Sequence, residues 1–226
     1  MNNASLALTG GIAAALLLLP LTPSHALSID KKDSRFALFL ERQEILLDYG
    51  SQDYDTSIEK LYISFAEPMI GGGLMGMNLG QLGVTQSDNP DTSGITAAGY
   101  RLGLWFEFTM PRKTTVQLKP RVFFDYGSAR GKNSNSREVE YSWWEYGAVA
   151  ILQVNFSNIT LGAGPAYNSV SGRQRISDRP NRSFEAWQRQ QWLGEIKFMV
   201  NSSGYIGMQL AGGDNRLFNI YFERKY

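Results

Sequence analysis

The chain has 226 residues, with 22 Lys and Arg against 21 Asp and Glu, and its formal net charge of +1 gives no basic surface for nucleic acid. Cysteine is absent, which excludes a disulfide framework and thiolate chemistry. The only histidine, His25, falls in a segment that we expect to be removed, so the mature chain has no histidine for general-base catalysis or metal binding. We therefore predict neither an enzyme nor a cofactor.

Residues 1–26 have the layout of a secretory signal peptide. They contain no Lys, Arg, Asp or Glu, an apolar run over 6–19 ends at Pro20, and Ser24-His25-Ala26 places small residues where a signal peptidase cleaves. The segment departs from the usual pattern because its start has no basic residue. A retained membrane anchor is the alternative, although the run is shorter than the roughly 20 apolar residues that span a bilayer. We predict a cleaved signal peptide over 1–26 and one exported domain over 27–226.

The first element of that domain, residues 35–48, fits two structures. Alternate residues from Phe36 to Leu40 are apolar, as in a strand, but the polar run 41–44 interrupts the alternation. The same residues also have the apolar spacing of an amphipathic helix that ends at Gly50. We favour a strand, because an odd number of strands would place the two chain ends on opposite sides of a barrel.

From residue 58 onward, apolar and polar residues alternate with the period of two that a β-strand requires. The clearest run covers 98–108, whose apolar face is made by Ala98, Tyr100, Leu102, Leu104, Phe106 and Phe108. Further on, a two-residue turn at Ser157-Asn158 sets Phe156 opposite Ile159, so that the apolar faces of both strands fall on the same side. Further runs follow over 116–126, 192–200, 205–210 and 218–226.

Short and long connections alternate along the chain. The short ones lie at 68–73, 111–114, 157–158 and 201–204, and the longer polar ones lie at 51–57, 85–93, 128–137 and 168–183. Bacterial outer-membrane barrels have this plan, with short periplasmic turns and long outer loops. The sequence therefore predicts an all-β fold, a single-chain antiparallel transmembrane β-barrel of about ten strands. Two alternatives stay open, namely eight strands with an N-terminal amphipathic helix, and a soluble lipocalin-like barrel with its apolar face inside.

The chain ends in Phe218-Asn219-Ile220-Tyr221-Phe222-Glu223-Arg224-Lys225-Tyr226, a strand with alternate apolar residues and a final aromatic residue. Together with the signal peptide and the loop plan, this ending resembles the small outer-membrane β-barrel proteins of Gram-negative bacteria, the group of the OmpA, OmpX and OmpW membrane domains. The resemblance covers 35–226 and implies a location in the cell outer membrane. It also implies that the barrel assembly machinery reads Phe218, Ile220, Phe222 and Tyr226. Tyr stands where Phe is usual and Arg224 interrupts the apolar face; no motif selects a subfamily, so no catalytic or binding residue is carried over.

The polar face of the strands supplies the candidate site. Its charged members are Arg101, Glu107, Lys119, Arg121, Asp125, Glu145, Glu195 and Lys197. A turn centred on Lys113 sets Glu107 opposite Lys119 and Arg101 opposite Asp125. These charges make either a polar lumen that selects a small solute or a salt-bridged plug. We favour the plug, since a barrel of roughly eight to ten strands is mostly filled by its own side chains.

Two outward surfaces suggest partners. Aromatic residues near strand ends, among them Tyr100, Trp144 and Trp192, fit the girdles found at membrane interfaces. The polar segments 128–137 and 168–182 hold many Arg and Lys residues, which either bind lipopolysaccharide phosphates or are ordinary solvated charges. We expect outer-membrane lipid, lipopolysaccharide and the barrel assembly machinery as partners, with a small solute as a further candidate.

Three functions remain open from the sequence. We expect a structural, surface-interaction or envelope-integrity barrel with a mostly filled polar lumen. The alternative is a narrow, porin-like channel for small or hydrophobic solutes. The third is an enzyme acting on envelope lipids, against which the absence of histidine from the mature chain argues.

Overall fold

The computed structural model describes residues 34–69, 72–92, 94–110, 115–132, 137–177, 179–186, 190–213 and 215–226. The predicted signal peptide over 1–26 lies outside these residues. The described residues form eleven β-strands, and they include no helix long and apolar enough to cross a membrane. The strands are β1 (Arg35–Asp48), β2 (Asp53–Pro68), β3 (Gly73–Gln86), β4 (Thr96–Phe108), β5 (Val116–Lys132), β6 (Glu138–Phe156), β7 (Ile159–Ile176), β8 (Arg182–Ala186), β9 (Gln190–Met199), β10 (Gly204–Gly212) and β11 (Arg216–Lys225).

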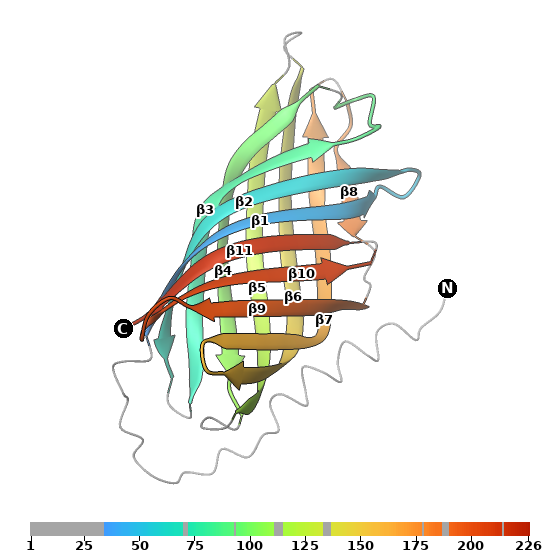
Figure 1. Ribbon diagram of the computed structural model, residues 1–226. Helices are drawn as coiled ribbons and strands as arrows, with labels where there is room; N and C mark the ends of the chain where they lie inside the picture. Colours follow the sequence, from blue (N-terminus) through green and yellow to red (C-terminus); the bar gives the residue numbers. More distant parts are fainter. Residues whose placement is uncertain are drawn as a thin grey trace.

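Ten of the strands form a closed antiparallel ring (Figure 1). Their order is β11-β10-β9-β7-β6-β5-β4-β3-β2-β1, and β11 pairs with β1 to close it, from Arg35 opposite Lys225 to Glu44 opposite Arg216. Closure leaves no unpaired sheet edge in this ring, as a sheet embedded in lipid requires. The segment 35–48 is a strand, so the ten-strand prediction is confirmed and the alternative with an N-terminal helix is wrong.

The first and last described residues meet at one end of the barrel, which we call the turn end. There the Tyr226 N–H donates to the Ser34 carbonyl at 2.9 Å. The tight turn between β6 and β7 lies at the same end, with Phe156 opposite Ile159 as predicted. We call the opposite end, where β1, β3, β5 and β7 finish, the loop end.

The register of β4 on β5 differs from the prediction by two residues. Glu107 lies opposite Arg121 instead of Lys119, and Arg101 lies opposite Gly127. An isolated bridge between Met110 and Leu118 continues the same register beyond β4. The centre of the connection therefore falls one residue later than the predicted centre at Lys113, and each residue moves to a partner two positions along.

At the loop end the barrel has eight strands instead of ten, because β8 takes the place of β9, β10 and β11 between β7 and β1. Strand β8 pairs with β7 over Ser171–Gln174 and with β1 at Leu47 and Asp48. These positions lie beyond those at which β7 pairs with β9 and β1 pairs with β11. In Figure 1, β8 continues the wall above the shorter red strands β9, β10 and β11. The upper ring, which we call the loop-end ring, thus consists of β1 to β8.

In the ten-strand ring the outward side chains are apolar and the inward ones are mostly polar. The exposed apolar band includes Leu38, Leu40, Leu61, Ile63, Phe65, Met75, Met77, Leu79, Leu102, Leu104, Leu118, Phe124, Leu152, Leu161, Phe198, Ile206, Leu210, Phe218, Ile220 and Phe222. Aromatic residues stand at its loop-end margin, where Trp192 is 72% exposed. This is the pattern of a barrel surrounded by lipid, and the soluble lipocalin-like alternative required the opposite one.

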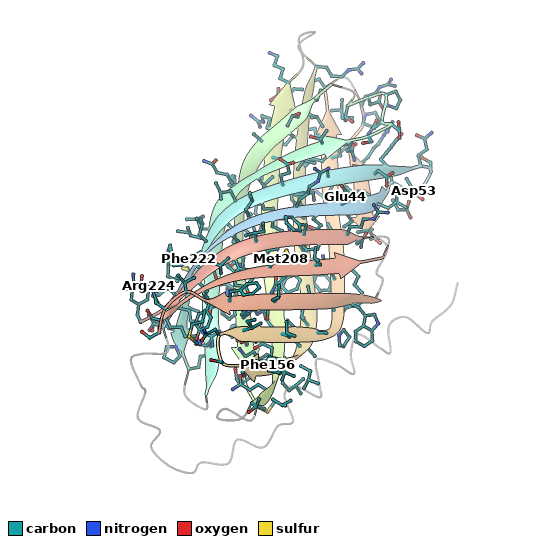
Figure 2. The ribbon with its side chains drawn as sticks, in the orientation of Figure 1. Glu44, Asp53, Phe156, Met208, Phe222 and Arg224 are labelled. Carbon is teal, nitrogen blue, oxygen red and sulfur yellow. The ribbon has the colours of Figure 1, made fainter. Side chains whose placement is uncertain are left out.

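Beyond the band, the same strands reverse which face is apolar. On β6, Val139, Tyr141 and Trp143 are buried inside the loop-end ring, whereas Glu138 and Glu140 lie on its outer face. Figure 2 shows Glu44 and Asp53 toward this polar end of β1 and β2, and Phe222 nearer the other end. The interior cluster comprises Ile45, Leu47, Ile58, Leu82, Val84, Ile95, Ala97, Ala129, Val139, Tyr141, Trp143, Val170, Ile176, Phe184 and Ala186. The loop-end ring therefore has the core of a water-soluble barrel.

This reversal corrects three predicted loops. Within 51–57, β2 already begins at Asp53. Within 128–137, β5 continues to Lys132, and within 168–183, β7 continues to Ile176 before β8 begins at Arg182. The sequence prediction followed an apolar outward face, and that face becomes polar where the strands leave the band. The alternation itself continues without interruption.

Candidate functional site

The eight predicted lumen charges line one cavity inside the ten-strand ring. Four more charged side chains belong to the inner wall and were missed, namely Arg35, Glu41, Lys60 and Glu223. The signal for Lys60 was present, because it alternates with the exposed Leu61 on β2. The residues of β1 could not be assigned to a face while the segment fitted both a strand and a helix.

A central cluster of ion pairs crosses the lumen between β1, β2, β4, β5 and β6. Lys60 Nζ lies 2.9 Å from Glu41 Oε1 and 3.1 Å from Glu145 Oε2. Arg101 Nη2 donates to Asp125 Oδ2 at 2.7 Å, which realises the predicted contact despite the shifted register. The Nη1 atom of Arg101 lies 3.9 Å from Glu41. These five residues, which we call the central cluster, hold three carboxylates against two cations.

Nearer the turn end, Glu107 binds two arginines. It accepts a hydrogen bond from Arg121 Nη2 at 2.5 Å and another from Arg35 Nη1 at 3.1 Å. The Arg121 guanidinium also lies 4.8 Å from the centre of the Trp105 ring, and Trp105 Nε1 donates to Ser64 Oγ at 3.0 Å. The predicted pair of Glu107 with Lys119 is wrong, because the register brings Arg121 opposite Glu107.

On the facing wall, Glu195 is the acceptor for several donors. It accepts hydrogen bonds from Gln209 and from the Tyr221 hydroxyl at 2.7 Å each, and a further one from Gln153. Lys197 Nζ lies 3.4 Å from the same carboxylate. Both oxygens of this carboxylate are therefore satisfied by donors of its own wall.

The cavity between these walls has a volume of about 160 Å³. One side is apolar and is made by Val149, Ile151, Ala166, Leu193, Ala211 and Leu217. Lys119 lines the cavity as well, and within the described part of the chain its ammonium makes no ion pair or hydrogen bond. The site thus combines an apolar wall with a cation that lacks a close anionic partner.

Exposure of the inner charges rises toward the turn end. The side chain of Lys60 in the central cluster is 2% exposed, whereas those of Arg35 and Arg121 are 15% and 29% exposed. Toward the loop end the interior is closed by the apolar cluster and then by a network around Gln86. Its amide donates to Tyr49 at 2.7 Å, and Tyr141 and Gln174 donate to its carbonyl. The cavity therefore lies below the closed part of the interior; it extends from Arg35 at the turn end to Arg216 at the other end of β11.

The outer face of the loop-end ring carries a row of arginines above the apolar band. Arg130 on β5 and Arg175 on β7 lie on either side of Glu140, and Arg173 lies one outward position nearer the band. Arg130 is ion-paired with Glu138 at 3.2 Å and with Glu140 at 3.4 Å. We call Arg130, Arg173 and Arg175 the basic row. Its first member, Arg173, lies one outward position above Trp144, whose ring contacts that of Tyr126 with centroids 4.7 Å apart.

The predicted assembly residues Phe218, Ile220, Phe222 and Tyr226 are exposed on the outer face at the end of the chain. The first three belong to β11, the strand that closes the ring against β1. Arg224, on the same face, lies over the Tyr226 ring at 5.2 Å. Their recognition by assembly machinery stays a prediction.

No protein-family model and no curated protein sequence matches the chain. Solved structures do resemble it. The translocator domain of the autotransporter NalP from Neisseria meningitidis has a TM-score of 0.50 and 11% identity, over 99% of this chain and 97% of that one. An outer-membrane channel from Pseudomonas putida F1 has a TM-score of 0.49 and 8% identity, over 92% and 100%. The outer-membrane protease OmpT from Escherichia coli has a TM-score of 0.44 and 8% identity, over 89% and 99%.

At such identities the likeness shows the fold alone. The chain has the all-β, antiparallel fold of the small outer-membrane barrels, as the sequence predicted. The exposed apolar band and this fold agree with the predicted location in the outer membrane. The roles of these neighbours differ, and they include a protease, a channel and a translocator domain.

Proposed function

We propose that this protein is a closed outer-membrane barrel that presents its loop-end ring at the cell surface, where it serves surface interaction and envelope integrity. The observation that supports this best is the double closure of the lumen. The central cluster crosses the ten-strand ring, and the apolar cluster then fills the loop-end ring. An apolar, close-packed core admits neither ions nor water, so an axial path for solutes ends there. The proposal includes no catalytic step.

The test is the electrical conductance of planar lipid bilayers that contain the purified protein. We expect no stable conductance steps, while a general porin added to the same bilayers gives them. Steady, porin-like steps from this protein would contradict the proposal and favour the narrow channel. That second candidate is supported by the charged cavity, which occupies part of the path.

We further propose that the basic row binds phosphate groups of lipopolysaccharide in the outer leaflet. Arg173 and Arg175 are exposed, and they lie directly beyond the aromatic margin formed by Tyr126 and Trp144. Aromatic margins mark the level of the membrane interface, and phosphates at that level are within reach of guanidinium groups just above it. The ion pairs with Glu138 and Glu140 position Arg130, the member of the row on β5.

This partner is tested by measuring the lipopolysaccharide that stays bound to the barrel after purification. The variant Arg173→Gln/Arg175→Gln should retain less of it than the wild type. The matched control is Arg42→Gln/Arg216→Gln, which removes the same charge from the exposed outer faces of β1 and β11. Equal retention by both variants would show that the basic row has no special part.

A further inference from the structure

We propose that the lumen cavity binds a small amphipathic anion, a carboxylate with an apolar body about the size of one aromatic ring. This goes beyond the proposed surface role, since it concerns the inner wall and holds whether or not the barrel conducts. The proposal rests on the volume of the cavity, on its apolar and charged walls, and on the absence of a close anionic partner for Lys119 within the described residues.

The apolar side of the cavity fits a hydrocarbon body. Ile151, Leu193 and Ala211 form a buried apolar cluster inside a ring whose inner face is otherwise mostly polar. Gly162 and Gly164 lie beside it, and a side chain at Gly164 would collide with the Ala150 carbonyl at 1.8 Å. A cavity of about 160 Å³ is similar to the engineered apolar cavity of ~150 Å³ that accommodates benzene. The apolar wall therefore offers room for one ring or a short alkyl chain.

The charge at the turn end of the cavity favours an anion. The charged groups that line it there are the cations Arg35, Lys119, Arg121 and Lys197 and the carboxylates Glu107, Glu195 and Glu223. Glu107 is held by two arginines, and Glu195 by Lys197 and its amide and hydroxyl donors. Lys119 has no such partner among the described residues, and two of its charged neighbours, Lys197 and Arg35, carry the same charge. A ligand carboxylate beside Lys119 would relieve this repulsion.

Unpartnered polar atoms show that the cavity has sites for hydrogen bonds. Within the described residues, Arg101 Nε and Nη1 and Asn219 Oδ1 are buried without a hydrogen-bond partner, and both residues line the cavity. Buried polar groups are nearly always satisfied in folded proteins, by protein, water or ligand. The carboxylate itself belongs at the opposite, turn end of the cavity, because the central cluster around Arg101 already holds more carboxylates than cations.

Binding is tested by equilibrium dialysis of radiolabelled benzoate against the barrel in lipid nanodiscs, with empty nanodiscs subtracted. We expect saturable binding of benzoate, weaker binding of benzyl alcohol, which lacks the charge, and weaker binding of inorganic phosphate, which lacks the apolar body. Lys119→Gln should weaken benzoate binding about tenfold or more, the effect of losing one charge-assisted hydrogen bond. Lys132→Gln, at the exposed loop end of the same strand, should leave it unchanged.

A second variant tests the apolar wall with Lys119 intact. Ala211→Leu fills the cavity beside Ile151 and Leu193, and it should abolish benzoate binding; Ala166→Met serves the same purpose if that barrel does not fold. A heat-dependent shift in gel mobility shows that each variant is folded. The proposal is overturned if wild type binds no benzoate, if phosphate binds as well as benzoate, or if Lys119→Gln and the filled cavity bind benzoate like the wild type. None of these outcomes bears on conductance or lipopolysaccharide retention, so the proposed function is tested separately.

Discussion

The Arg101 guanidinium donates to the Asp125 carboxylate at 2.7 Å, although the two residues are not opposite each other in the sheet. Arg101 is opposite Gly127, and Asp125 is opposite Gly103. A Cβ atom at Gly103 would lie 1.5 Å from Asp125 Oδ1, so the carboxylate occupies the space that the missing side chain leaves. The diagonal ion pair therefore depends on a glycine in the neighbouring strand.

Removal of Arg101 should destabilise the barrel strongly. Arg101→Met leaves the Asp125 carboxyl group buried without its cation, and a buried pair that loses one partner typically costs about 3–5 kcal/mol. Arg101→Met/Asp125→Leu removes both charges and should recover most of that loss. The free energy of unfolding in urea, measured in lipid vesicles by tryptophan fluorescence, compares the two. A double variant as unstable as the single one would show that packing, and not the uncompensated charge, carries the effect.

The position of Trp105 depends on Gly76 of the neighbouring strand. A Cβ atom at Gly76 would lie 2.2 Å from the Trp105 ring, so Gly76→Ala must displace the indole and break its hydrogen bond to Ser64. Overpacking of this kind costs about 1–3 kcal/mol. Gly83→Ala on the same strand is the control, because its nearest atom would be 4.0 Å away.

The Gly76→Ala effect should shrink in a Trp105→Phe background, where the ring is smaller. Unfolding free energies of the four proteins make a double-mutant cycle that isolates the contact. If the cost of Gly76→Ala is the same in both backgrounds, the crowding does not come from Trp105.

An arginine in the apolar band should be far more costly than one just beyond it. Leu152 on β6 is exposed within the band, whereas Ser128 on β5 lies on the outer face two positions beyond Tyr126. Leu152→Arg should cost about 2–4 kcal/mol if it lies deep in the bilayer, and Ser128→Arg about 0–1 kcal/mol near the interface. Unfolding in lipid vesicles measures both. Equal costs would place the lipid boundary elsewhere than at Tyr126 and Trp144.

The ten-strand ring could be predicted from the sequence because every strand that crosses the lipid needs an apolar outer face. An apolar outer face at alternate positions identified β4, and the tight turn at Ser157-Asn158 fixed the register of β6 on β7. The same alternation named eight charged residues that line the cavity. The connection between β4 and β5 has no comparable turn motif, so its register, and with it the partner of Glu107, was misplaced by two residues.

The strands of the loop-end ring could not be predicted in the same way, because their outer faces are polar. Outside the lipid, water replaces hydrocarbon around the barrel, so the polar residues face outward and the apolar ones fill the interior. Val139 and Val170 are buried for this reason, while Glu138 and Arg173 are on the outside. A pattern search for apolar outer faces interprets such segments as polar loops. The pairing of β8 with β7 and β1 could not be predicted, since it depends on β9, β10 and β11 being too short to reach the loop end.

The loop-end ring should open without the ten-strand ring when β8 is weakened. Phe184 of β8 is buried against Tyr49 and Tyr141, with ring centroids 5.5 and 6.5 Å away, and β8 is held to β1 by only two residue pairs. Phe184→Ala removes the largest side chain that β8 contributes to the core, a change that costs about 3–5 kcal/mol where the site cannot collapse. We therefore expect faster amide hydrogen exchange in β8 and unchanged exchange in β9.

Hydrogen exchange followed by mass spectrometry resolves the two strands. Phe156→Ala is the control, because this side chain is exposed at the turn end and fills no part of the core. Faster exchange in β8 alone would show that the loop-end ring is a separate cooperative unit, held by its own soluble-type core. Equal loss of protection in β8 and β9 would mean that the two rings unfold together. The loop-end ring would then be as stable as the membrane-embedded ten-strand ring.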